Sequence, residues 1–222
     1  MTGRSVPEAG SGPARSVPNP LSPLWRGRRI GLLGGSFNPA HQAHVMISLQ
    51  AIRHLGLDEV WWLVSPQNPL KPTKGMAPLA ERLAGARRVA GTARIRPTDI
   101  EAALGTRYTV DTLAALKQRY PQTFFVWLIG ADNMVQMPRW KQWECIFRLA
   151  PVAILARPTY SLPAMSSTAA KRFGTRRVPV EHARALATMT PPAWTFIHFR
   201  HDPTSATAIR ARRRAHSRSS VD

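Results

Sequence analysis

The sequence GGSFNPAHQAH, residues 34–44, joins an apolar run at 29–33 to a segment in which Val45, Leu49 and Ile52 recur at helical spacing. We therefore expect a short buried strand, a glycine turn and a helix, in that order. In an open parallel sheet, such a turn lies at the edge where nucleotide phosphates bind. Glycine lets the backbone approach a phosphate closely, and the first amides of the helix point toward it.

The rest of the chain continues this alternation of apolar runs and helical patterns. Further strands are expected at 60–64, 94–96, 124–129, 151–156 and 194–199. Further helices are expected from Pro78 onward and at 109–120, 131–135, 141–149, loosely 164–172, and 206–214. The strands are continuously apolar, which predicts an α/β fold with a parallel sheet covered by helices on both faces.

Three parts of the chain differ in composition. Residues 1–27 are rich in proline and lack periodicity, so we expect a disordered leader that can be deleted without loss of activity. Residues 28–214 form the predicted domain, and residues 215–222 form a polar tail. A length of 222 residues suits one domain with irregular ends.

Bulk composition narrows the classes of function. No apolar run reaches membrane-spanning length, and a single cysteine, Cys145, excludes an internal disulfide framework and a cysteine-rich zinc site. We expect a cytoplasmic protein with no membrane partner. The net charge is +19; residues 1–27 carry +2 and residues 205–222 carry +4, which leaves +13 on the body. A basic body favours polyanionic ligands, although a general drift toward arginine explains the charge equally well.

Two histidines, His41 and His44, flank the start of the predicted helix, three residues apart, so that both can face one phosphate group. Two alternatives stay open: a metal site, for which no third ligand is nearby, and a purely structural turn. The stretch is not a P-loop, because no Gly-Lys-Ser/Thr follows, and it is not a G-x-G-x-x-G dinucleotide motif.

The stretch at 34–44 resembles the G-[ST]-F-[DN]-P-x-H-x-x-H signature of the nucleotidylyltransferase superfamily. TSATAIR, residues 204–210, resembles the second signature of that superfamily, I-S-[ST]-T-x-I-R. The resemblance implies a Rossmann-like nucleotidylyltransferase fold and in-line transfer of the adenylyl group of ATP. It implies Mg²⁺ as the cofactor that accompanies ATP, with no protein metal site. The catalytic residues that it implies are His41, His44 and Arg210, and the ATP-binding residues are Gly34, Gly35, Ser36, Phe37, Arg157, Ser205 and Thr207.

Three further stretches, at 65–71, 107–113 and 129–133 followed by Trp140, resemble bacterial nicotinate-nucleotide adenylyltransferases. The resemblance implies transfer to nicotinate mononucleotide, giving nicotinate adenine dinucleotide and pyrophosphate in NAD biosynthesis. The substrate-binding residues that it implies are Lys71, Tyr108, Thr109, Asp132, Trp140 and Lys141. Trp140 offers a flat face to the pyridinium ring, amides near Thr109 and Lys141 bind its carboxylate, and Asp132 suits the ribose hydroxyls.

Some residues depart from the family pattern. Ala43 stands where the family has glycine, Ala206 removes one hydroxyl, and an arginine-rich end at 212–214 replaces a further helix. Three alternatives therefore stay open: a phosphopantetheine adenylyltransferase, a degenerate inactive relative and, from the charge, a nucleic-acid-binding protein. Against the last, the aromatic residues lie mostly inside apolar runs, so no nucleic acid is expected. The preference between nicotinate and nicotinamide mononucleotide and a possible homo-oligomer also stay open.

Overall fold

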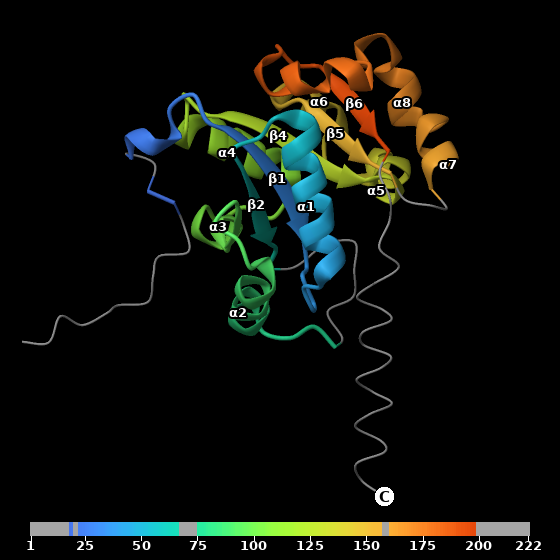
Figure 1. The fold of residues 1–222 in the computed structure, drawn as a ribbon. Coiled ribbons are helices and arrows are strands. Elements are labelled where there is room, and N and C mark those ends of the chain that lie inside the picture. The colour runs from blue at the N-terminus through green and yellow to red at the C-terminus, as the bar shows by residue number, and fades with distance from the viewer. Residues whose placement is uncertain (1–17, 20–21, 67–74, 157–159, 199–222) are drawn as a thin grey trace, which may run out of the picture.

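A single parallel sheet organises the protein (Figure 1). The computed structural model describes residues 18–19, 22–66, 75–156 and 160–198. The sheet order is β3-β2-β1-β4-β5-β6, and every neighbouring pair is parallel. The strands are β1 Arg29–Gly35, β2 Glu59–Val64, β3 Ile95–Thr98, β4 Phe124–Gly130, β5 Val152–Leu155 and β6 Trp194–Ile197. The predicted α/β fold is confirmed. From β1 the chain adds β2 and β3 on one side of the sheet, and it then adds β4, β5 and β6 on the other side. The switch point between β1 and β4 is the place where open sheets bind ligands.

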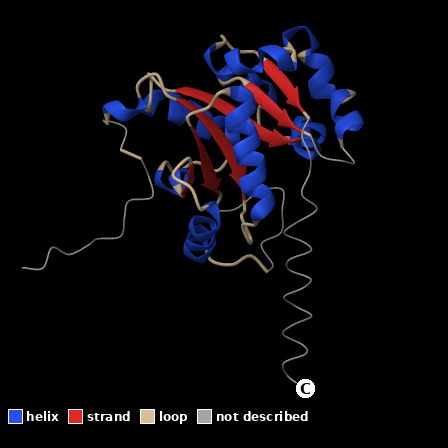
Figure 2. Ribbon diagram, viewed as in Figure 1, coloured by secondary structure: helices blue, strands red, loops and turns tan. Residues whose placement is uncertain are grey.

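Helices cover both faces of the sheet, as Figure 2 shows. They are α1 Gln42–Leu55, α2 Leu79–Ala90, α3 Ile100–Ala103, α4 Thr109–Arg119, α5 Ala131–Gln136, α6 Trp143–Leu149, α7 Ser161–Met165 and α8 Thr168–Arg172. Leu32 and Trp61 join the core cluster that contains α4 and α6 residues, whereas their chain neighbours Leu33 and Trp62 join the cluster under α1 and α2. Successive side chains of each strand therefore point to opposite faces of the sheet. Because helices cover both faces, both sets of side chains are buried, which explains the continuously apolar strand sequences.

The α1 helix shows where the expected pattern was inaccurate. Gly56 ends the helix in a left-handed conformation at φ 61°, as expected of a glycine stop. Leu49, however, is 42% exposed. Ser48 is buried instead, and its hydroxyl lies 2.7 Å from Trp62 Nε1. The buried face of this helix therefore accommodates the Ser48 hydroxyl, because the indole N–H of Trp62 donates a hydrogen bond to it.

The region after β5 differs most from expectation. In place of one helix at 164–172, the chain forms α7 and α8, followed by a 3-10 helix at Val180–Thr188 that packs against α1 and β6. Ser167 caps α8 by accepting a hydrogen bond from the amide of Ala170, so the chain restarts there. The expected helix at 206–214 lies outside the described residues.

The folded unit begins upstream of the expected boundary at Arg28. Pro23–Trp25 form a 3-10 turn, and Trp25 is only 7% exposed. Its ring meets Trp61 edge-on at 5.2 Å between centroids, and its Nε1 donates a hydrogen bond of 2.8 Å to the Asn19 carbonyl. The expected leader at 1–27 is therefore too long, because a large aromatic side chain at its end completes the core.

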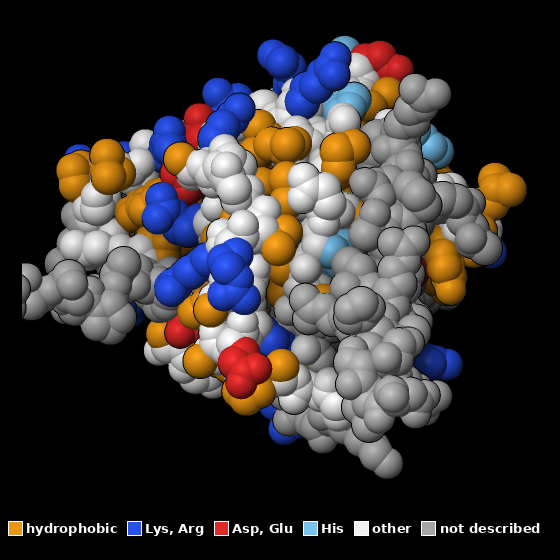
Figure 3. Space-filling model, turned by 60° about the horizontal axis from the view of Figure 1, so that its bottom comes forward, with side chains coloured by type: hydrophobic (Ala, Val, Ile, Leu, Met, Phe, Trp, Pro, Cys, Tyr) orange, Lys and Arg blue, Asp and Glu red, His pale blue; other side chains and the backbone are white. Residues whose placement is uncertain are grey.

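One face of the molecule carries its positive charge in a dispersed form (Figure 3). On the face in Figure 3, Lys and Arg side chains are spread among hydrophobic and polar ones instead of forming one continuous stripe. Of the helices in the described part of the chain, none combines the length and apolar character that crossing a membrane requires.

Candidate active site

The two histidines of the glycine turn lie side by side at the start of α1. His41 is the residue that precedes the helix, and its amide donates a hydrogen bond of 3.2 Å to His44 Nδ1. The ring centroids are 3.9 Å apart, and His41 is 9% exposed. The structure thus brings the two predicted catalytic side chains together at the start of α1, where their hydrogen bond fixes the His44 ring.

The ring of Phe37 packs against His44. Its φ angle of 45° is in the left-handed region, and its ring is buried. The ring stacks on Trp62 at 5.0 Å between centroids and lies 4.8 Å from His44. The side chain of Phe37 therefore holds the histidine in place, which leaves only its backbone amide for the predicted contact with ATP.

Arg82 fixes the loops on which the site is built. This α2 residue is 4% exposed, and its guanidinium donates to the carbonyls of Ser36 at 2.7 Å, Ser65 at 2.8 Å and Pro66 at 3.1 Å. Burial lowers the pKa of Arg82 from its ordinary value. Sequence reasoning missed this residue, because an arginine on an amphipathic helix normally faces solvent.

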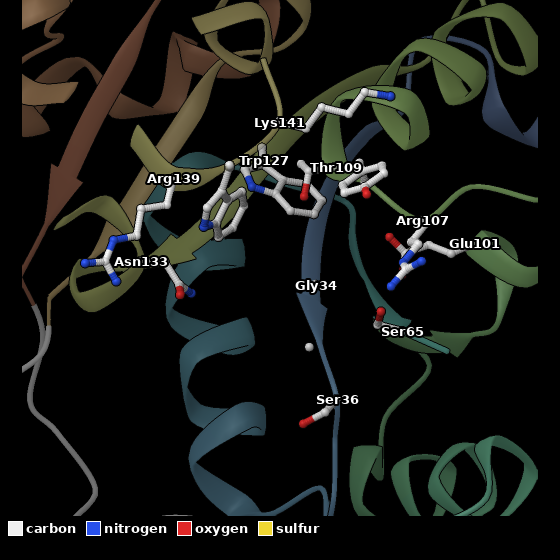
Figure 4. A pocket seen from close by; sticks show the side chains of 13 residues that line it. Gly34, Ser36, Ser65, Glu101, Arg107, Thr109, Trp127, Asn133, Arg139 and Lys141 are labelled. Atoms are coloured by element: carbon white, nitrogen blue, oxygen red, sulfur yellow. The ribbon is translucent and has the colours of Figure 1, made fainter. Parts of the chain in front are cut away.

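A cavity of about 160 Å³ opens beyond the carboxyl ends of β1 and β4 (Figure 4). Seven of the predicted site residues line it: Gly34, Gly35, Ser36, Tyr108, Thr109, Trp140 and Lys141. Six lining residues were missed: Ser65, Glu101, Arg107, Trp127, Asn133 and Arg139. Phe37, His41, His44 and Asp132 are not among the residues that line this cavity. The motif at 34–36 and the motif at 108–109 are distant in sequence, yet they form walls of the same pocket.

The end of the cavity near α4 combines a helix start with a constrained lysine. Thr109 is the first residue of α4, so unsatisfied backbone amides of the first turn lie at this wall. Lys141 Nζ lies 2.9 Å from an Asp111 carboxylate oxygen and 4.8 Å from the ring centroid of Tyr108. The lysine charge is thereby partly balanced by Asp111, and the role of the amides near Lys141 stays a prediction.

Glu101 places a buried carboxyl group in the cavity wall, next to α4. The residue is 6% exposed, and its Oε1 accepts a hydrogen bond of 3.2 Å from Thr112. Burial raises the pKa of Glu101 to about 7, although hydrogen bonds from Thr112 and Ser65 act in the lowering direction. No local signal in the sequence distinguishes this glutamate from an ordinary acidic residue in the first turn of a helix.

Five predicted site residues lie outside the described residues: Lys71, Arg157, Ser205, Thr207 and Arg210. Within the described part of the chain, no three or more His, Cys, Asp or Glu side chains group together in a way that could hold a metal ion.

Comparison with known proteins supplies independent information. The family model described as cytidylyltransferase-like matches residues 32–212. The chain is 50% identical to the probable nicotinate-nucleotide adenylyltransferase of Parvibaculum lavamentivorans, over 85% of this chain and 94% of that one. It is 53% identical to the probable enzyme of the same name from Cereibacter sphaeroides, over 82% and 96% of the two chains. A solved structure of Plasmodium falciparum nicotinic acid mononucleotide adenylyltransferase complexed with NaAD has a TM-score of 0.60 and 18% identity over 83% of each chain, which supports the fold.

Proposed function

This chain belongs to the nicotinate-nucleotide adenylyltransferase family, and from that premise we propose how its pocket holds the two substrates. The enzyme transfers the adenylyl group of ATP to nicotinate mononucleotide, and the products are nicotinate adenine dinucleotide and pyrophosphate in NAD biosynthesis. The observation that carries the assignment of the pocket is the meeting of two motifs: Gly34–Ser36 at one wall and Tyr108–Thr109 at another wall of one cavity.

The glycine turn and the start of α1 serve the phosphates of ATP in this proposal. The α-phosphorus is attacked in line by the acceptor's own phosphate, so the protein needs to position groups and to stabilise charge. The amides of Ser36 and Phe37 and the paired rings of His41 and His44 supply donors on one side of the α1 start. Arg210, Ser205 and Thr207, which lie outside the described residues, act on the same phosphates according to the family resemblance.

The walls formed by Thr109 and Trp140 serve the acceptor. Trp140 is half-buried and lines the cavity, so a face of its ring is available for the pyridinium ring. The first-turn amides of α4 are donors that suit the ring carboxylate. Asp132, in the first turn of α5 beyond the end of β4, remains the proposed partner of the ribose hydroxyls.

Mg²⁺ fits this site as an ion that arrives with ATP. It prefers octahedral oxygen coordination and commonly keeps several waters while it binds substrate phosphates. The described pocket agrees with that role, because Glu101 is the one carboxylate among its lining residues. The lining also contains three cationic side chains, Arg107, Arg139 and Lys141, which suit phosphate better than a metal ion. We therefore propose that phosphate oxygens and water hold the ion, and that it adds positive charge at the departing pyrophosphate.

The decisive experiment measures pyrophosphate release from ATP and Mg²⁺ with three acceptors offered separately: nicotinate mononucleotide, nicotinamide mononucleotide and phosphopantetheine. We expect release with nicotinate mononucleotide, and a loss of at least a hundredfold in kcat for His44→Ala. His54→Ala, in the last turn of the same helix, is the matched control and should keep wild-type activity. Release with phosphopantetheine alone would overturn the acceptor, and equal activity in both histidine variants would overturn the placement of the phosphates.

A further inference from the structure

Trp127 stands out among the buried tryptophans of this protein. It belongs to β4, it is 3% exposed, and its side chain lines the cavity. Its buried Nε1 has no hydrogen-bond partner among the described residues. Four other tryptophan indole N–H groups donate hydrogen bonds within the protein, to the carbonyl of Asn19, the carboxylate of Glu59, the hydroxyl of Ser48 and the carbonyl of Phe173.

The position of this ring is set by the backbone of β1. An added Cβ at Gly34 would lie 2.9 Å from Trp127 Cη2, so the indole packs directly on the glycine. Figure 4 shows the Trp127 ring and the Thr109 side chain in the same pocket above Gly34. A buried donor without a partner is unfavourable, and such a group in a binding pocket commonly acquires its partner from the ligand. The ring therefore lines the pocket wall and carries a desolvated donor for which the described residues supply no partner.

The chemistry of the acceptor decides which atom this donor would meet. An indole N–H only donates, and a pyridine carboxylate only accepts. The first-turn amides of α4, at Thr109, are also donors at this cavity. A carboxylate can satisfy donors on two sides, one with each oxygen, whereas a carboxamide has one acceptor oxygen and presents its NH₂ to the other donor.

We propose that the indole N–H of Trp127 donates a hydrogen bond to the ring carboxylate of nicotinate mononucleotide and so contributes to selecting this acceptor over nicotinamide mononucleotide. The inference rests on the proposed function of the pocket and adds a specificity-determining residue to it. Hydrogen bonds to a charged acceptor are stronger than neutral ones, so removal of the donor should affect the carboxylate more than the carboxamide.

The test is Trp127→Phe, which keeps an aromatic ring against Gly34 and removes only the N–H and the second ring. We expect the KM for nicotinate mononucleotide to rise about tenfold to a hundredfold, with kcat within about threefold of wild type. The KM for nicotinamide mononucleotide should change by less than about threefold, so the ratio of the two kcat/KM values falls. Trp194→Phe is the matched control, because that buried indole donates to Phe173 away from the cavity.

The outcomes separate the inference from the function on which it rests. A wild-type enzyme that does not use nicotinate mononucleotide would overturn the proposed function. A wild-type enzyme that uses it, together with a Trp127→Phe variant of unchanged acceptor preference, would overturn the inference alone. If the variant does not fold, a crystal structure of the wild-type protein with nicotinate mononucleotide decides: an Nε1-to-carboxylate distance below about 3.2 Å is expected, and any longer separation contradicts the proposal.

Discussion

Nη1 of Arg82 donates a hydrogen bond of 2.7 Å to the carbonyl oxygen of Ser36. The same nitrogen lies 2.8 Å from the carbonyl of Ser65, so one buried cation joins the loop that follows β1 to the loop that follows β2. Ser36 and Ser65 both line the cavity. The cavity walls at Ser36 and Ser65 are therefore held by Arg82, a residue that does not itself line the cavity.

Arg82→Met should weaken the fold and the site together. The substitution leaves buried carbonyls without a donor, so we expect the free energy of unfolding to fall by about 2–4 kcal/mol. The KM for ATP should also rise, because Ser36 is no longer held. Urea denaturation and steady-state kinetics measure these effects. Arg88→Met, at an exposed position of the same helix, should change stability by less than about 0.5 kcal/mol; equal effects in both variants would contradict the role of Arg82.

Local patterns in the sequence were sufficient for the sheet and for the turn at 34–36. The strands β1 and β4 are continuous apolar runs, and parallel strands place their following loops at one edge, which is where the turn at 34–36 lies. The family resemblance, and not the pattern alone, supplied the acceptor and the assignment of Trp140.

Three important residues could not be identified in this way, because tertiary packing gives them their properties. Arg82 and Glu101 occupy ordinary helical positions in the sequence, and only the folded chain buries their charges against other loops. Trp127 belongs to a strand that is apolar in sequence, and its unpartnered N–H becomes evident only when its surroundings are known.

Gly34→Ala should disturb the acceptor wall without unfolding the protein. The new methyl group would lie 2.9 Å from Cη2 and 3.3 Å from Cζ2 of Trp127, so the rigid indole must move. We expect kcat/KM for nicotinate mononucleotide to fall about tenfold to a hundredfold. Gly85→Ala is the control, since a Cβ there meets only Arg88 Nη2 at 3.7 Å in the interior of α2. It should stabilise the protein by up to about 1 kcal/mol and leave activity intact; a Gly34→Ala enzyme with wild-type kinetics would show that the ring position does not matter.

Glu101 predicts a defined dependence of stability on pH. Its pKa is about 7 in the folded protein against an ordinary value of 4.5, so the folded state holds a proton that the unfolded chain releases. The stabilisation from this proton is complete below about pH 4.5 and is lost as the pH rises to about 7, an effect of about 3 kcal/mol in total. Glu101→Gln lacks this ionisable group, so its stability does not contain this pH-dependent contribution. The free energy of unfolding of the wild type, relative to that of the variant, should therefore fall by about 3 kcal/mol between pH 4.5 and pH 8. Urea titrations at both pH values measure it, and a constant difference would contradict the assignment.

The same titration should appear in substrate binding. Ionisation of Glu101 puts a negative charge in the wall of a cavity that receives an anionic acceptor. The KM for nicotinate mononucleotide should therefore rise above pH 7 in the wild type and stay flatter in Glu101→Gln. Identical pH profiles of KM for the two enzymes would mean that the carboxyl group does not face the bound acceptor.

Trp25 makes the position of the N-terminal boundary testable. The ring is 7% exposed and packs edge-on against Trp61, whereas its chain neighbour Leu24 is 71% exposed. Removal of a buried tryptophan side chain costs about 3–5 kcal/mol, which lowers the Tm of a domain of this size by about 10 °C. Trp25→Ala and deletion of residues 1–27 should both show this loss, while Leu24→Ala and deletion of residues 1–17 should not. Calorimetry of the four proteins distinguishes the two boundaries: if the longer deletion melts with the wild type, the core is complete without Trp25, and the domain begins at Arg28 after all.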